Sequence, residues 1–446
     1  MHDPDFLALP ARLDRDPLYL GLDIGTSGVR SAVVDSDGSL VSIAREPMHP
    51  SKGDDVSAET WWETVSACLD TQAKALAGQG GSMASIRAAA IDGTSGTMVL
   101  VDDNARPVTP ALMYDSSGFD DEASRIAACA PQDSIVRGSG SALARMLRLQ
   151  HHDPDRRARH LCHQADFILA RLTGRPGLSD ENNVLKLGYD LESEAWPDWF
   201  AACGARMELL PDVLPVGVIA GTVTEAMADR FGFARDLRLV AGTTDSVAAF
   251  LASGATAIGE AVTSLGTTLA IKLLSDVRVD DAARGIYSHR LGDRWLAGGA
   301  SNTGGGALLH HFSAETIAAL SERIDPDQPT GLDYYPLARA GERFPVNDPS
   351  LAPRLEPRPD DDAVFLQGML EAIARIEGEG YAALTALGAP APARVLTAGG
   401  GAQNDAWTAI RRRTLGCLVE KAPEAEASVG MALLARRGLE NSGHSR

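Results

Sequence analysis

The sequence predicts an α/β protein built from two duplicated domains. The first reason is a hairpin that occurs twice: apolar strands at residues 18–24 and 29–34 flank a tip of Gly, Thr and Ser, and strands at 261–265 and 269–274 flank a similar tip. The second reason is that short apolar strands alternate with helical stretches along the rest of the chain. The third is length, since 446 residues exceed the usual size of one hydrophobic core. One motif present twice, far apart in the chain, indicates duplication.

The remaining elements follow from apolar periodicity and turn residues. We expect domains at residues 1–252 and 253–446, with a last helix at 427–436 that can pack back on the first domain. Strands are predicted at 86–91, 97–101, 237–241, 295–297 and 394–397, and helices at 161–172, 246–252 and 363–387. Gly-rich turns are expected at 242–244 and 298–306, and the Pro- and Asp-rich stretch 325–362 predicts an irregular surface segment.

Composition narrows the classes of partner and the compartment. Lys and Arg number 41 against 60 Asp and Glu, a formal charge of −19 that disfavours nucleic acid and anionic membranes as partners. No run approaches the roughly 18 apolar residues that span a bilayer. The N-terminal residues 1–17 carry acids where a signal peptide carries a basic and then an apolar stretch. Five scattered cysteines argue against a disulfide framework, so we expect a cytoplasmic protein.

His160, His163 and Asp166 have the spacing closest to that of metal ligands. No glutamate base lies between the histidines, and no third ligand is indicated. We therefore interpret these residues as an ordinary polar helix face.

Four loops share a feature that suits phosphate binding. Each follows an apolar strand and exposes small residues: Gly25–Gly28, Asp92–Gly96, Gly266–Thr268 and Gly399–Gly401. Glycine lets a backbone approach phosphate closely, and Ser and Thr hydroxyls add donors. A single loop of this kind is more simply a tight turn, but four in one chain favour a nucleotide. The usual phosphate signatures are absent, and the G-x-G-x-x-A match at residues 378–383 lies inside a helical pattern.

Two aspartates are candidates for chemistry. Asp23 lies in an apolar strand directly before the first tip, where a carboxylate is costly unless it is paired or binds a cation. Such a carboxylate is a natural partner for Mg²⁺, which keeps most of its water ligands. Asp245 precedes an apolar helix, where an N-cap is the simpler interpretation. Together with Asp23 and the four loops, a catalytic carboxylate becomes the favoured hypothesis for Asp245.

Five motifs together carry a family resemblance: GLDIGTSG, IDGTSG, AGTTDS, VTSLGTT and TAGGGAQN, in this order over residues 18–436. The set resembles the FGGY family of carbohydrate kinases, in the fold class shared by actin, sugar kinases and heat-shock chaperone ATPases. The resemblance implies two actin-like, ribonuclease H-like domains with a cleft between them. DENNVLKLGYD, GASNTGGG, TGLDYYPL and GERFP resemble the compact D-ribulose kinases of cyanobacteria and plants.

The resemblance also implies a role for individual residues. Asp245 would be the general base and Asp23 the carboxylate on the magnesium side. The two phosphate hairpins would use Thr26 with Ser27, and Gly266 with Thr267. The adenosine would be held by Gly400, Gly401 and Asn404, and the sugar would contact Asp23, Ser27, Gly28, Ser95 and Asp245. Larger family members carry a sugar-contact stretch, Trp-x-Asp-x-Arg, at the position that here reads Tyr114–Gly118, without the arginine. Its absence argues against direct transfer of sugar specificity from xylulose or glycerol kinases and fits a smaller sugar pocket.

The implied activity is transfer of the γ-phosphoryl group of ATP, with Mg²⁺, to the terminal hydroxyl of D-ribulose. Another pentulose or polyol, D-xylulose first, is the alternative within this class. An actin-like or chaperone-like ATPase switch is the alternative from another class, and it is disfavoured because the chain shows no peptide-binding domain after its last helix. The expected partners are the sugar and ATP, for a monomer or homodimer.

Overall fold

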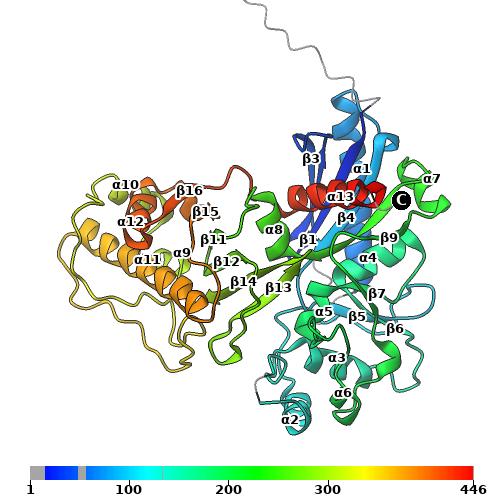
Figure 1. Ribbon diagram of the computed structural model, residues 1–446, viewed down its shortest axis with the longest axis horizontal. Helices are drawn as coiled ribbons and strands as arrows, with labels where there is room; N and C mark the ends of the chain where they lie inside the picture. The colour runs from blue at the N-terminus through cyan, green and yellow to red at the C-terminus, as the bar shows by residue number, and fades with distance from the viewer. Residues whose placement is uncertain (1–15, 49–56, 133, 445–446) are drawn as a thin grey trace, which may run out of the picture. The chain divides into compact units, whose positions relative to one another are not determined.

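The computed structural model describes residues 16–48, 57–132 and 134–444 (Figure 1). Most of the N-terminal stretch on which the compartment prediction rests lies outside these residues. The chain divides into two compact units: Met1–Ala130 with Val136–Ala249 and Glu426–Arg446, and Phe250–Ala425 with Pro131–Ile135. Among the described residues, no helix combines the length and apolar character needed to cross a membrane.

The first unit is organised around a six-stranded mixed sheet in the described part of the chain. Its strands, in spatial order, are β3 (Leu40–Pro47), β2 (Gly28–Val34), β1 (Leu18–Gly25), β4 (Ile86–Gly93), β10 (Arg238–Thr244) and β9 (Ile219–Thr222). β1 and β2 form the predicted antiparallel hairpin, while β1, β4 and β10 run parallel. The carboxyl ends of three neighbouring strands therefore meet at one edge of this sheet.

The two faces of this sheet differ because side chains alternate along each strand. Leu20 and Leu22 share an apolar core with Trp61 of α1 (Ala58–Gly78) and Phe167 of α4 (Gln164–Thr173). The other face carries small residues such as Gly21. A Cβ built on Gly21 would lie 1.9 Å from the Ser428 carbonyl, so the glycine allows α13 (Ala427–His444) to lie directly on β1 and β4 (Figure 1).

A second core in this unit belongs to the segments inserted between β4 and β9. They are β5 (Met98–Val101), α2 (Asp120–Cys129), α3 (Ala142–His151), β6 (His160–His163), α5 (Glu181–Leu187) and α6 (Trp199–Ala202). The same stretch holds β7 (Leu178–Asp180) and β8 (Asp212–Leu214), and α7 (Glu225–Phe231) follows β9 and contributes Ala228 and Phe231 to the first core.

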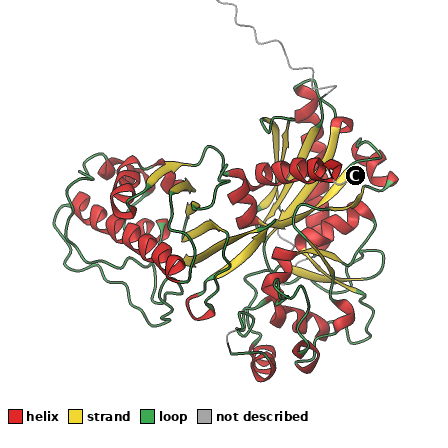
Figure 2. Ribbon diagram, in the orientation of Figure 1, coloured by secondary structure: helices red, strands yellow, loops and turns green. Residues whose placement is uncertain are grey.

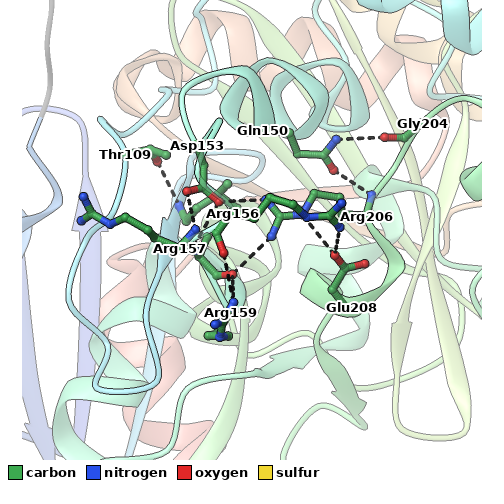
Figure 3. Close-up of polar contacts among 11 residues, drawn as sticks. Thr109, Gln150, Asp153, Arg156, Arg157, Arg159, Gly204, Arg206 and Glu208 are labelled. Atoms are coloured by element: carbon green, nitrogen blue, oxygen red, sulfur yellow. Dashed lines mark hydrogen bonds and ion pairs between the residues drawn. The ribbon is translucent and has the colours of Figure 1, made fainter.

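Buried Asp153 fixes the connection from α3 to β6 (Figure 3). Its carboxylate accepts from the amides of Arg157 and Ala158, at 2.8 and 3.1 Å, and from Arg206 Nη1 at 2.8 Å. On α3 itself, Gln150 donates to the Gly204 carbonyl and accepts from the Arg206 amide, at 2.9 and 2.8 Å. The end of α3 is therefore tied to the segment that follows α6.

The described residues of the second unit are also built around a six-stranded sheet with helices beside it (Figure 2), and the two sheets differ in one edge strand. Its strands, in spatial order, are β13 (Tyr287–Leu291), β14 (Arg294–Ser301), β12 (Leu269–Ser275), β11 (Glu260–Leu265), β15 (Arg394–Ala398) and β16 (Leu418–Lys421). β11 and β12 form the second hairpin, and β11 runs parallel to β15, as β1 does to β4. Its helices are α9 (Gly305–Leu309), α10 (Ala314–Ser321), α11 (Asp362–Ala386) and α12 (Asp405–Leu415), and α8 (Asp245–Ala252) links the two units.

Several sequence predictions about elements are corrected. The helix predicted at 161–172 begins only at Gln164, because residues 160–163 pair with β5 as a strand. His163 is therefore not on a polar helix face: it is fully buried, and its Nδ1 lies 2.8 Å from Asp166 Oδ2 in a capping box. The turns predicted at 242–244 and at 298–301 are strand, because they continue the ladders of β10 and β14.

Candidate functional site

Three carboxylates gather where the parallel strands of the first unit end. Asp23 of β1 is the register partner of Asp92 of β4, and Asp92 is the partner of Thr243, two residues before Asp245. Asp23 and Asp245 both raise the pKa of Asp92 through their charge, which shows that the three groups lie close together. The sequence predicted Asp23 and Asp245, and the structure adds Asp92.

Asp92 is the functional candidate that sequence reasoning missed. Its side chain is fully buried and accepts no hydrogen bond from an N–H or hydroxyl of the described residues; its hydrogen-bond partner is the carboxyl of Asp23, and that bond requires a proton on one of the two carboxyls. Burial, followed by the charges of Asp23 and Asp245, raises the pKa of Asp92 well above its usual range. The signal was present, because Asp92 ends an apolar strand in the same way as Asp23.

Asp23 has a cationic partner on the neighbouring strand. Arg30 is its register partner on β2, and Arg30 Nη1 donates to Asp23 Oδ2 at 3.1 Å. Burial raises the pKa of Asp23, and Arg30 offsets part of that rise. Arg30 Nε also lies 3.8 Å from Glu426, which pairs with Arg45 at 2.7 Å. Arg30 was not predicted, although it lies only two residues after the first tip.

The first hairpin tip offers donors to solvent. Thr26 and Ser27 are exposed, whereas Gly28 is buried. The Met48 amide donates to the Ser27 carbonyl at 3.0 Å, which fixes the tip against the end of β3. The tip is therefore held by its backbone, and its hydroxyls are left accessible.

The turn that holds Ser95 is enclosed by hydrogen bonds. The Thr97 amide donates to the Thr94 carbonyl at 3.1 Å, and the Thr94 amide donates to Gln164 Oε1 at 2.9 Å. Gly96 has φ of +85°, a conformation that costs little only for glycine. Ser95 Oγ is buried and has no hydrogen-bond partner in the described structure. A fixed turn with one unpaired hydroxyl suits a ligand that can complete the hydrogen bond.

Asp245 begins α8, and its Oδ1 accepts from the neighbouring Ser246 amide at 2.7 Å. The strand before it is held from α5, where Asn182 Nδ2 donates to Thr243 Oγ1 at 2.9 Å. Asp180 caps α5 by accepting from the amides of Asn182 and Asn183, at 2.9 and 3.0 Å. The DENN residues of the motif DENNVLKLGYD, for which the sequence alone indicated no chemical role, thus fix the chain next to Asp245.

The second unit contains a cavity of about 570 Å³. Residues predicted for the nucleotide line it: Gly266, Thr267, Gly400, Gly401 and Asn404. Its other lining residues are largely apolar and include Leu308 of α9, Ile317 of α10 and Trp407 of α12. The sequence did not predict that α9 and α10 line this cavity, because a short apolar helix beside a cavity has the same sequence pattern as one that packs in the core.

The second hairpin tip is held by the Gly-rich start of α9. The amides of Gly305 and Gly306 donate to the carbonyls of Gly266 and Thr267, at 2.8 and 3.0 Å. A Cβ on Gly305 would lie 2.8 Å from the Gly266 carbonyl oxygen, so this approach requires glycine. The GGG motif therefore supports the second tip.

Asn404 lines the cavity, and its side chain is already bonded. Its Oδ1 accepts from the Trp407 amide at 2.9 Å as the N-cap of α12, and its Nδ2 donates to Ser321 Oγ at 2.8 Å. In this state Asn404 shapes the wall of the cavity by joining α12 to α10.

Family models match both units. The N-terminal domain model of the FGGY family of carbohydrate kinases matches residues 18–252, and the C-terminal domain model matches residues 261–439. The chain belongs to the FGGY family of carbohydrate kinases. The ATPase-switch alternative is therefore set aside, and the motif-based family prediction is confirmed.

Curated relatives and solved structures agree with this assignment. Xylulose kinase of Escherichia coli K12 is 25% identical over 417 residues, covering 87% of this chain and 83% of that protein. Xylulose kinase of Streptomyces coelicolor is 26% identical over 455 residues, covering 94% of this chain and 87% of that protein.

Two solved kinase structures share the fold. Xylulose kinase of Rhodospirillum rubrum has a TM-score of 0.82 at 22% identity, covering 94% and 90% of the two chains. Plasmodium falciparum glycerol kinase with ADP has a TM-score of 0.82 at 16% identity, covering 96% and 90%. The predicted two-domain α/β sugar kinase fold is confirmed.

Proposed function

We propose that this FGGY kinase transfers the γ-phosphoryl group of ATP to the terminal hydroxyl of D-ribulose, giving D-ribulose 5-phosphate and ADP. The observation that carries the proposal is the group of three carboxylates at the strand ends of the first unit, beside an unpaired Ser95 hydroxyl. Carboxylates and hydroxyls arranged in this way can bind and deprotonate an alcohol. A family of carbohydrate kinases needs both operations.

Asp245 is the proposed base because its carboxylate is only partly buried, whereas Asp23 and Asp92 are buried. Asp245 takes the proton of the sugar hydroxyl. The hydroxyl oxygen forms a bond to the γ-phosphorus while the bond from that phosphorus to the ADP oxygen breaks. Asp23, Ser27, Gly28 and Ser95 are proposed to hold the sugar. Phosphoryl transfer depends mainly on such positioning and on charge stabilisation.

The chain has groups that fit ATP and Mg²⁺. The apolar cavity of the second unit suits a nucleoside, and the exposed tip residues Gly266 and Thr267 suit phosphate. No set of three or more His, Cys, Asp or Glu side chains in the described residues could hold a metal ion alone. Asp23 therefore fits a Mg²⁺ that keeps water and phosphate ligands, and the ion would neutralise charge on the phosphates.

D-xylulose is the second candidate substrate, because the relatives described above are xylulose kinases. D-ribulose is favoured by the motifs that resemble compact D-ribulose kinases and by the missing arginine in Tyr114–Gly118. The acidic composition and unpaired cysteines fit the cytoplasm, where both sugars would be small-molecule partners.

The test is ADP release by the purified full chain with ATP and Mg²⁺ and one sugar at a time: pentuloses, hexuloses or polyols. We expect the highest kcat/KM with D-ribulose, and a phosphate ester on its terminal carbon by ³¹P NMR. If D-xylulose is the better substrate, the ribulose assignment is wrong while the kinase assignment stands. If no sugar stimulates ADP release, the proposed reaction itself is wrong.

A further inference from the structure

A buried arginine behind the Ser95 turn is bonded to backbone carbonyls. Arg145 of α3 is 4% exposed. Its Nη1 donates to the Gly96 carbonyl at 3.2 Å, and its Nη2 donates to the carbonyls of Gly140, at 2.8 Å, and Tyr114. In the described structure no carboxylate lies within ion-pair distance of Arg145. A buried cation held only by carbonyls is costly, so its retention calls for a specific role.

The charge of Arg145 persists despite its burial. Desolvation lowers the pKa of Arg145 to about 10, and the nearby carboxylate of Asp115 offsets part of this fall. The guanidinium is therefore protonated at neutral pH, and each of its hydrogen bonds to a carbonyl is charge-assisted.

Arg145 joins two segments that the sequence associated with the sugar. Gly96 follows Ser95, and a Cβ on Gly96 would lie 3.0 Å from Arg145 Nη1, so the guanidinium packs directly on the turn. Tyr114 opens the segment that lacks the arginine of larger family members. The Tyr114 amide also donates to Thr97 Oγ1 at 2.9 Å, so both of its backbone polar groups are fixed to the turn or to Arg145.

The helix that carries Arg145 is anchored at both ends. Ser141 caps its first turn by accepting from the Ala144 amide at 3.1 Å. Gln150 and Asp153 fix its other end through the hydrogen bonds of Figure 3. The guanidinium therefore projects from a rigid support, which a side chain needs if it is to set the position of a turn.

We propose that Arg145 is a positioning residue for sugar recognition: by binding the carbonyls of Gly96 and Tyr114 together, it fixes Ser95 and the Tyr114–Gly118 segment in one arrangement. The Arg145 guanidinium thus supplies a cation that holds the Tyr114–Gly118 segment in place, and this segment has no arginine of its own. The inference rests on the proposed function, since it concerns how the same site selects its sugar.

The experiment compares two variants of Arg145 with a matched control at another arginine that donates to a backbone carbonyl. Arg145→Met keeps most of the volume and removes the donors, while Arg145→Lys keeps the charge and loses the fork. Arg125→Met is the control: Arg125 of α2 donates to the Cys203 carbonyl at 2.9 Å, and this bond involves neither the Ser95 turn nor the Tyr114–Gly118 segment. KM and kcat are measured for D-ribulose, D-xylulose and ATP, alongside Tm.

We expect Arg145→Met to raise the KM for the preferred sugar by at least about fivefold and the KM for ATP by less than about twofold. The ratio of kcat/KM between the two sugars should fall towards one, because a displaced Ser95 discriminates hydroxyls less well. Arg145→Lys should show a smaller change in the same direction. Arg125→Met should lower Tm slightly, because one hydrogen bond is lost, and leave every KM within about twofold of the wild-type value.

Two results would overturn the inference. In the first, the sugar KM and the sugar ratio of Arg145→Lys and Arg145→Met match those of Arg125→Met, so that Arg145 only stabilises the fold. In the second, Arg145→Met raises the KM for ATP as much as that for sugar. If Arg145→Met does not fold, Arg145→Lys alone decides by the same criteria. A wild-type chain that phosphorylates no sugar would refute the proposed function first, which separates the two failures.

Discussion

Asp245→Asn should abolish sugar phosphorylation while the fold and nucleotide binding persist. Removal of a general base typically lowers a rate about 10²- to 10⁴-fold, or about 3 to 5 kcal/mol of transition-state stabilisation. The structure predicts little cost to folding, because the bond that Asp245 Oδ1 accepts from the Ser246 amide at 2.7 Å can be accepted equally by the Asn carbonyl oxygen. Asn and Asp are also nearly equivalent at the start of a helix.

The loss of activity compared with the loss of stability separates the two hypotheses for Asp245, which are a general base and a helix cap. If the residue only caps α8, Asp245→Asn leaves kcat unchanged, and Asp245→Ala costs about 1 kcal/mol of stability. If it is the base, both variants lose activity to a similar extent and only Asp245→Ala loses stability.

The assay is coupled ADP release at saturating sugar and ATP, with ATP binding followed by calorimetry and stability by urea unfolding. Near-normal turnover of Asp245→Asn would refute the base assignment. Loss of ATP affinity together with activity would also count against it, since the nucleotide cavity is lined by residues of the second unit.

Four further variants test other parts of the molecule. Ser95→Ala should raise the sugar KM about two- to tenfold, with the KM for ATP unchanged, because one hydrogen bond is lost. Asp23→Ala should reduce activity severely and flatten its dependence on Mg²⁺ concentration; unchanged magnesium titrations would contradict the metal role. The raised pKa of Asp92 means that the folded state keeps a proton that the unfolded chain has lost, so the unfolding free energy falls as pH rises through that range. Asp92→Asn should remove this fall and raise Tm at neutral pH, measured without nucleotide or metal; a lower Tm would contradict it. Arg411→Met should cost about 3 to 5 kcal/mol by leaving buried Glu377 unpaired, while replacement of both by apolar residues should recover most of the loss in urea unfolding.

The elements that the sequence predicted best are those with a strong local signal. The hairpins β1–β2 and β11–β12 were predicted because apolar strands flank tips of small residues. α11 was predicted to within one residue at each end because its apolar period continues over 25 residues. Gly266, Thr267, Gly400, Gly401 and Asn404 were found through motifs, and the structure places all of them around one cavity.

The features that the sequence could not give depend on distant partners. The strand β6 was taken for helix, because the pairing of Cys162 with Val99 is invisible in a window that contains only one of them. Arg145 lies in an ordinary amphipathic helix, so its sequence context does not set it apart. What sets it apart is its hydrogen bond to the Gly96 carbonyl, in a turn 49 residues away in the sequence. Asp92 was noted only as the start of a turn; the sequence shows its place at the end of an apolar strand, but its register with Asp23 on another strand is visible only in the structure.

The duplicated sheets place different chemistry at equivalent positions. Aligning the tips GTS and GTT matches Asp23 to Ser264, and the parallel partners of these residues are Asp92 and Ala398. The first unit thus has two buried carboxyls where the second has an exposed hydroxyl and a methyl group. A carboxylate close to a polyphosphate is repelled strongly in a partly buried site unless a cation lies between them, so neutral residues at these positions suit a copy of the fold that binds a nucleotide. Carboxylates suit a copy that draws a proton from an alcohol. The duplication therefore leaves the backbone plan intact while a few side chains differ, and this difference in charge supports the proposal that the base and sugar contacts belong to the first unit and the nucleoside site to the second.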